Sequence, residues 1–314
     1  MNSLLTRAHA NTHPSEKHRS LSGAPRSRDI AGMALALTAA AAFALASASA
    51  RLAFHGGSNP LTVAAVRFLV PMSVLVVWLL LRGVPLKLPF WQRWAAVVLG
   101  VVTAAYSWAL LTAIALVPIG LAILIFYLFP LITTVILASC GWGKLAWQTI
   151  GAIALAFLGL ALVFQPLGQS LNIAGVLLAL VAALGVAVVI AVSSRIFGAG
   201  DSRSVTLHMV AVAGAMLIVI CAAHGEFALP QTGVGWLGFI GNSAFYTFAI
   251  IAFFIAISMI GPLRVSLLSY VEPVVAAGLG VALLGETLAP AQIMGIAIVI
   301  IALVAATVWR KRLI

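Results

Sequence analysis

Charged residues are scarce in this chain. Asp, Glu, Lys and Arg make up 7% of its 314 residues, whereas hydrophobic residues make up 64%. Soluble domains are typically about 25% charged and 45–50% apolar. A soluble fold of this size cannot leave so little polar surface to face water, so we expect lipid to cover it. The mean hydropathy of +1.20 agrees with an all-α integral membrane protein.

Cysteine and aspartate are almost missing as well. Cys140 and Cys221 lie in or beside different predicted helices, and this placement supports neither a disulfide nor a metal site. The segment Gly198-Ala-Gly-Asp201 matches the G-x-G-D string of intramembrane aspartyl proteases. That chemistry needs two aspartates that share a proton inside the membrane. The other aspartate, Asp29, is expected at a cytoplasmic helix end like Asp201, so we interpret the match as a loop.

Sequence motifs for hydrolysis and nucleotide binding are also missing. The chain has no H-E-x-x-H, no P-loop and no Gly-x-Ser-x-Gly elbow. We therefore predict no catalytic residue, no metal and no cofactor, and we exclude ATP-driven transport. The alternative from another functional class is a membrane-embedded enzyme that acts on a lipid or another membrane substrate, and the lack of paired acids or an activated nucleophile counts against it.

Long apolar runs are what the sequence has in abundance. About 20 apolar residues suffice for a helix to cross the ~30 Å hydrocarbon core of a bilayer. Breaks with Gly, Pro, Asn and Ser separate the runs, as between His55 and Pro60. The sequence predicts ten transmembrane helices, near residues 30–53, 61–81, 94–116, 120–140, 149–166, 173–195, 205–224, 234–258, 263–284 and 291–309.

The chain is built twice from one unit, at an offset of 143 residues. The segment that begins at Asp29 as Asp-Ile-Ala-Gly recurs from Asn172 as Asn-Ile-Ala-Gly, and far downstream the same offset matches two tyrosines and two prolines. Each copy has five helices, an odd number, so the second copy enters the membrane from the side opposite to the first. The two repeats are therefore inverted in topology. We expect a first repeat at 30–166 and a second at 172–309, between a disordered tail at 1–29 and a basic tail at 310–314.

The distribution of Lys and Arg predicts the orientation. Both tails and the even-numbered turns are basic, whereas the odd-numbered loops hold almost no Lys or Arg, with Arg51 as the clear exception. Both termini are therefore expected in the cytoplasm. The net charge of +11 then reflects topology and attraction to anionic lipid headgroups. Nucleic acid is the competing partner for a basic chain, but ten predicted spans argue against it.

Two charged residues are predicted deep in the membrane. Glu272 lies roughly 15 Å from Pro262, and Arg67 roughly 9 Å below the outer end of its helix, at 1.5 Å rise per residue. A charge at the bilayer centre costs about 2.5–3.5 kcal/mol, so each of these two charged residues is expected to have a structural or functional role. One interpretation is structural, either an ion pair between the two or a capped helix kink. The other places Glu272 on a substrate or proton pathway, and the sequence leaves both open.

Pro130 and Pro273 occupy matched positions in the fourth and ninth predicted helices. Proline removes a backbone donor and clashes with the preceding turn, which frees a carbonyl inside the membrane. A passive kink explains either proline alone but explains a symmetric pair less well. Tyr127 and Tyr270 lie three residues before the prolines on the same helix face, which makes them candidate cavity-wall or packing residues.

Further polar side chains fall in the third and eighth predicted helices. Tyr106, Asn242 and Tyr246 are candidates for the substrate pathway. Polar side chains in lipid-embedded helices usually face protein or a cavity, and hydrogen bonding between helices explains any single one equally well.

The closing part of the chain resembles the second repeat of the EamA family within the drug/metabolite transporter superfamily. The resemblance rests on Leu268-Ser-Tyr-Val-Glu-Pro-Val-Val followed by Leu283-Leu-Gly-Glu-Thr287, and on the five-plus-five layout over residues 30–308. It implies a multi-pass secondary transporter of the bacterial inner membrane that works by alternating access. It also implies a small-molecule substrate, often an exported amino acid or a related metabolite. The motifs are mainly architectural, so they name no substrate, coupling ion or oligomeric state.

Overall fold

A computed structural model of the chain describes residues 27–117, 119–143, 146–164, 172–197, 202–284 and 288–310. These residues form twelve α-helical segments and no strand. The segments are α1 (Ser27–His55), α2 (Pro60–Leu81), α3 (Phe90–Leu116), α4 (Ile119–Phe126), α5 (Phe129–Ser139), α6 (Trp147–Phe164), α7 (Ile173–Phe197), α8 (Ser202–His224), α9 (Gly233–Ile260), α10 (Pro262–Leu268), α11 (Val271–Leu284) and α12 (Pro290–Arg310).

Several predicted features fall outside the described residues. They are the tails at 1–26 and 311–314, Lys144, the loops at 165–171 and 198–201, and residues 285–287 of the Leu-Gly-Glu-Thr turn. The last three residues of the predicted tail at 1–29 are helical, because the described part of α1 begins at Ser27. Asp29 lies in the first turn of α1, where a carboxylate offsets the positive end of the helix dipole.

The predicted breaks between runs act as helix caps. Asn59 accepts a hydrogen bond from the backbone N–H of Thr62 at 2.7 Å, and Pro60 opens α2 with a fixed φ. At the end of α9, Gly261 has φ +83°, a conformation that favours glycine, and Pro262 starts α10 directly afterwards. The bundle is therefore divided at the points where local turn chemistry predicts it.

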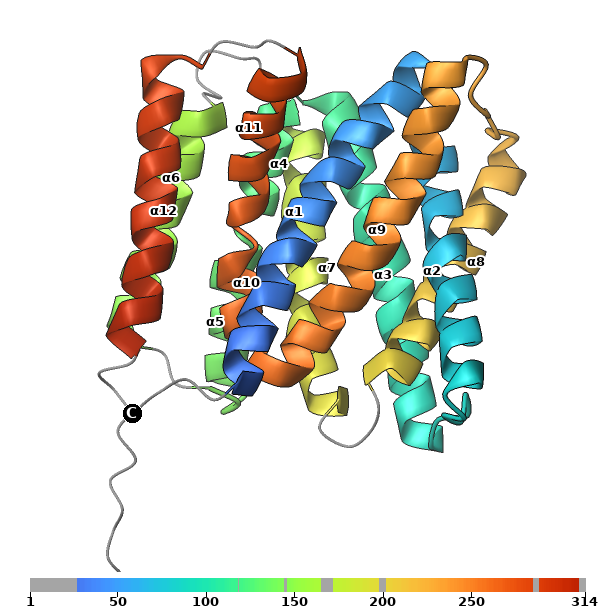
Figure 1. Cartoon of the computed structure of the whole chain (residues 1–314), viewed down its shortest axis with the longest axis horizontal. Helices are drawn as coiled ribbons and strands as arrows, with labels where there is room; N and C mark the ends of the chain where they lie inside the picture. Colours follow the sequence, from blue (N-terminus) through green and yellow to red (C-terminus); the bar gives the residue numbers. More distant parts are fainter. Residues whose placement is uncertain are drawn as a thin grey trace, which may run out of the picture.

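Eight segments in the described part of the chain are long and apolar enough to cross a membrane, with Leu121–Ser139 counted as one span. The α10–α11 pair and α12 run alongside them (Figure 1). The fourth and ninth predicted spans are not continuous helices. Each is divided in two, between α4 and α5 and between α10 and α11. Both divisions lie just before the matched prolines, because proline cannot donate to the preceding turn.

The packing of helices is reciprocal under the 143-residue offset. The offset matches α1 with α7, α2 with α8 and α3 with α9. The contact between α1 and α9 therefore has its counterpart in the contact between α7 and α3. The contact between α3 and α8 has its counterpart in the contact between α9 and α2. Gly32 of α1 is pressed against Ile260 at the end of α9, and Gly175 of α7 against Val117, the C-cap of α3, and these two pairs are matched by the offset. Figure 1 shows α1 and α7 running in opposite directions through the bundle.

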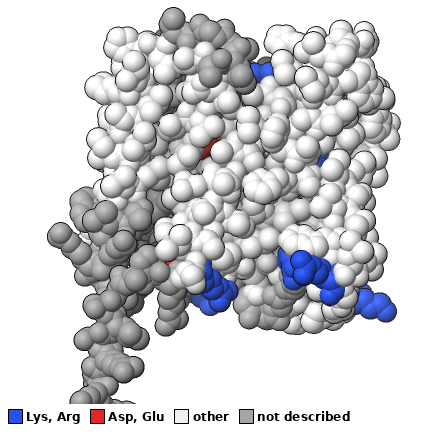
Figure 2. Space-filling model, viewed as in Figure 1, with Lys and Arg blue, Asp and Glu red and all other residues white. Residues whose placement is uncertain are grey.

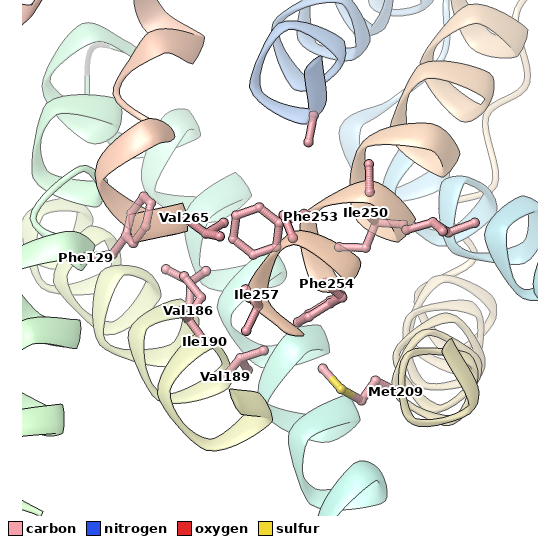
Figure 3. Close-up of a cluster of buried hydrophobic side chains, with 14 of the residues drawn as sticks. Phe129, Val186, Val189, Ile190, Met209, Ile250, Phe253, Phe254, Ile257 and Val265 are labelled. Atoms are coloured by element: carbon pink, nitrogen blue, oxygen red, sulfur yellow. The ribbon is translucent and has the colours of Figure 1, made fainter. Parts of the chain in front are cut away.

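Basic side chains gather at one end of the bundle. Figure 2 shows most of the visible Lys and Arg along the lower end, where α1 starts and α12 ends. Above this end lies a packed apolar layer built from five helices (Figure 3). Its labelled side chains are Phe129, Val186, Val189, Ile190, Met209, Ile250, Phe253, Phe254, Ile257 and Val265. The same buried cluster continues to Tyr127, Tyr246 and Tyr270, which are considered below.

Candidate functional site

Arg67 of α2 lies against aromatic rings inside the bundle. Its guanidinium carbon is 4.4 Å from the ring centroid of Tyr246 on α9 and 5.6 Å from that of Phe68. The Phe68 and Tyr246 rings meet edge to face, with centroids 5.4 Å apart. Phe68 is completely buried and Tyr246 nearly so, whereas Arg67 keeps part of its surface accessible. The guanidinium therefore lies against aromatic rings between helices, while part of the Arg67 side chain stays accessible.

The charge of Arg67 is not neutralised by a neighbouring carboxylate. Within the described ranges its guanidinium has no hydrogen-bond or ion-pair partner, and its buried Nε is unsatisfied. A desolvated cation–π contact is worth about 2 kcal/mol. The cost of an arginine at the centre of a membrane helix is about 2.5–3.5 kcal/mol on the lenient scale. The rings thus offset only part of the cost.

Two more predicted site residues lie near Arg67. Tyr106 of α3 is close enough to Arg67 and Tyr246 to interact with both electrostatically. Its position follows from helix packing, because a Cβ added at Gly185 of α7 would lie 2.7 Å from the Cβ of Tyr106. Asn242 lies one turn before Tyr246 on α9 and donates from Nδ2 to the carbonyl of Ala46 at 2.8 Å. Its Oδ1 is buried and has no partner among the described residues.

A second group of predicted residues meets at the two helix breaks. Tyr127, at the end of α4, and Tyr270, between α10 and α11, are matched by the 143-residue offset, and they contact each other. The Tyr270 hydroxyl donates to the carbonyl of Tyr127 at 2.9 Å, and the ring centroids are 5.7 Å apart. Equivalent points of the two repeats therefore touch at the centre of the bundle.

The contact between the two helix breaks is not symmetric, because Glu272 in the first turn of α11 has Phe129 as its counterpart in the first repeat. The Tyr127 hydroxyl lies close enough to its carboxylate to interact with it, whereas the Tyr270 hydroxyl bonds to a backbone carbonyl, so the two matched tyrosines have different partners. Glu272 is partly accessible, whereas Tyr127 and Tyr270 are almost fully buried. Pro130 begins the second half-helix of the first repeat, and Pro273 lies in the first turn of its counterpart, both of them buried.

Arg67 and Glu272 do not form an ion pair. Among the residues that the structure describes, an ion pair instead joins Arg264 Nη1 and Asp29 Oδ2 at 3.6 Å, at the basic end of the bundle. Arg67 acts on Glu272 only through its longer-range field. The interpretation of the two as a direct structural pair is therefore wrong. Their helices place each side chain against an aromatic partner instead.

Several site residues were not predicted from the sequence. Phe68 and Phe43 surround the Tyr246 ring, but apolar residues in an apolar helix carry no signal that separates them from lipid-facing ones. Thr133 on α5 is fully buried with an unpartnered hydroxyl in the described part of the chain. No group of three His, Cys, Asp or Glu among the described residues is arranged to hold a metal ion.

Comparisons with known proteins agree with this architecture. The sequence profile of the EamA-like transporter family matches residues 30–165 and again 173–308. The protein named "Uncharacterized inner membrane transporter YedA" from Escherichia coli K12 is 30% identical over 259 residues, which cover 80% of this chain and 82% of YedA. YedA proteins of Escherichia coli strains O6:H1 and O157:H7 match equally.

A solved crystal structure shares the fold. It superposes with a TM-score of 0.74 at 22% identity and covers 88% of this chain and 98% of the solved one. The relatives indicate a multi-pass inner-membrane transporter with a small-molecule substrate, rather than an enzyme. Because the family profile matches both halves of the chain, the protein belongs to the EamA-like transporter family.

Proposed function

We propose that this protein is a secondary transporter that exports a small metabolite, such as an amino acid or a related compound, across the bacterial inner membrane by alternating access. The observation that carries the proposal is the contact between Tyr127 and Tyr270. It joins equivalent points of the two family repeats at breaks in two helices. Half-helices that meet at the centre of a repeat-built bundle line the solute path in many transporters.

The reciprocal packing of α1 on α9 and α7 on α3 supports two inverted repeats of five spans. Opposite running directions of α1 and α7 support the same arrangement (Figure 1). In this proposal the α10–α11 pair and α12 join the eight apolar spans to give ten. The two repeats rock against each other around the central tyrosines.

The apolar layer of Figure 3 supplies the barrier that alternating access needs on one side. Along α9, Ile250, Phe253 and Ile257 follow Tyr246 toward the basic end of the bundle. The layer thus lies between the arginine site and that end. In the opposite state of the cycle these side chains separate and open the site toward the cytoplasm.

The basic end of the bundle is the cytoplasmic one in this proposal, because Lys and Arg are retained on that side. We expect reporter fusions at Arg312 to show a cytoplasmic location and fusions within the 165–171 loop to show a periplasmic one. Paired phosphatase and fluorescent-protein reporters measure the two sides independently. A periplasmic signal at Arg312, or a cytoplasmic one in the loop, would reverse the assignment.

Metabolite profiling tests the export function directly. We expect at least one small metabolite to accumulate in the medium of an overexpressing strain and inside the cells of a deletion strain. The comparison needs a third strain that expresses the protein at native level, to separate export from the effects of membrane overloading. Unchanged internal and external metabolites across the three strains would contradict the proposal.

A further inference from the structure

We propose that Arg67 binds the carboxylate group of the transported solute, an assignment that rests on the proposed transport function. Arg67 is a cation in the middle of an apolar bundle, without hydrogen-bond or ion-pair partner among the described residues. A charge in such surroundings normally has a counter-ion. The nearest acidic residue that acts on it, Glu272, does so only through its longer-range field. The counter-charge is therefore brought by the ligand.

The aromatic contacts leave the binding edge of the guanidinium free. The Tyr246 and Phe68 rings lie beside its carbon atom at 4.4 and 5.6 Å, as in cation–π contacts. These contacts occupy no N–H group. A guanidinium presents its donors as a planar fork that matches a carboxylate with two parallel hydrogen bonds. Because Arg67 is partly accessible, a solute in the pathway can reach that fork.

Neighbouring polar groups add a second point of recognition. Asn242 directs its Nδ2 to Ala46 and leaves a buried Oδ1 without a partner among the described residues. An oxygen in that state accepts a hydrogen bond from an N–H or O–H group of a ligand. Tyr106 lies within electrostatic range of Arg67. The site thus offers one cation and one free acceptor.

The charge of the site favours a monoanion. Arg67 is a single positive charge, and the field of Glu272 reaches it. A phosphate dianion would leave excess negative charge in a low-dielectric space, whereas one carboxylate neutralises one guanidinium. We therefore assign a carboxylate and not a phosphate group to this subsite.

The test uses the purified full chain in lipid nanodiscs and two matched pairs of probes, acetate with acetamide and benzoate with benzamide, at constant ionic strength. Each pair differs mainly in charge. We expect the carboxylates to raise the thermal unfolding midpoint and the amides not to. The shift should vanish in Arg67→Gln, shrink in Arg67→Lys and persist in Arg51→Gln, which removes the same charge at an exposed helix end.

The unfolding midpoint without probes provides a second, independent readout. Because the free guanidinium is uncompensated, Arg67→Gln should unfold at the same temperature as the wild-type chain or higher. A lower midpoint, or failure of Arg67→Gln to fold, would show a structural role and overturn the proposal. Equal shifts with carboxylates and amides, or a carboxylate shift that survives in Arg67→Gln, would overturn it as well.

Failure of this proposal can be told apart from failure of the proposed transport function. If carboxylates stabilise the chain through Arg67 while no metabolite responds to deletion or overexpression, the transport function fails and the anion subsite stands. If the exported solute carries no anionic group, transport stands and the assignment of Arg67 is overturned.

Discussion

Replacement of Glu272 with glutamine is expected to reduce transport strongly while the protein stays folded in the membrane. Of the acidic residues that the structure describes, Asp29 and Glu226 lie at helix ends or in a loop, and Glu272 is the one inside the bundle. Glutamine keeps the size of the side chain and retains an acceptor oxygen beside Tyr127. It cannot exchange a proton. If Glu272 carries the coupling proton, we expect export to fall at least about tenfold, the effect of roughly 1.4 kcal/mol on a rate.

The measurement is the export rate of the metabolite found by profiling, at several external pH values and equal amounts of protein in the membrane. Glu226→Gln is the matched control, because it makes the same chemical change at an exposed loop residue whose backbone carbonyl makes the contacts to Asn59 and Thr62. Wild-type export with unchanged pH dependence in Glu272→Gln would exclude the proton role. Loss of the variant from the membrane would instead show that the carboxylate is needed for folding.

Substitution of Gly159 with valine is expected to separate α6 from α12 and to reduce the amount of folded protein strongly. A Cβ at Gly159 would lie 2.7 Å from the carbonyl oxygen of Gly295 and 3.0 Å from the backbone nitrogen of Val299. A Cβ at Gly295 would in turn lie 2.5 Å from the carbonyl oxygen of Gly159. Backbone atoms cannot move aside as a flexible side chain does. We expect a cost of at least about 3 kcal/mol, the upper range for overpacked sites.

Gly151→Val is the control on the same helix. Gly151 is exposed and has no atom within 4 Å of an added Cβ, so valine there carries the same propensity cost without the clash. Monodisperse protein after extraction in mild detergent, and its thermal midpoint, measure the difference. Similar yields of the two variants would show that the α6–α12 contact contributes little to stability.

Large parts of the fold were predictable because they depend on local properties. The length of each apolar run must match the thickness of the bilayer, so most spans appear in the sequence directly. The breaks near Tyr127 and Tyr270 were predictable from Pro130 and Pro273, since proline disrupts a helix wherever it stands. Family membership was predictable from the repeat and the Glu-Pro segment, and the match of the family profile to both halves confirms it.

The contacts within the site were less predictable. The sequence placed Arg67 and Glu272 at depths that allow an ion pair, yet Arg67 lies on the Tyr246 ring and Glu272 lies beside Tyr127. Depth follows from the position along a helix, but partners depend on which faces of different helices meet. In helices that are apolar on every side, the sequence pattern carries little information about those faces.

The sequence by itself determined that this protein is helical, lies in a membrane, consists of two related halves and belongs to a transporter family, because composition, run length and repeat offset are properties of the chain alone. Only the tertiary structure decided that Tyr270 binds the backbone of its own counterpart Tyr127, and that Gly159 meets Gly295. Such contacts join residues more than 100 positions apart. They arise when small residues let particular helices approach closely, and that choice is made by packing in three dimensions.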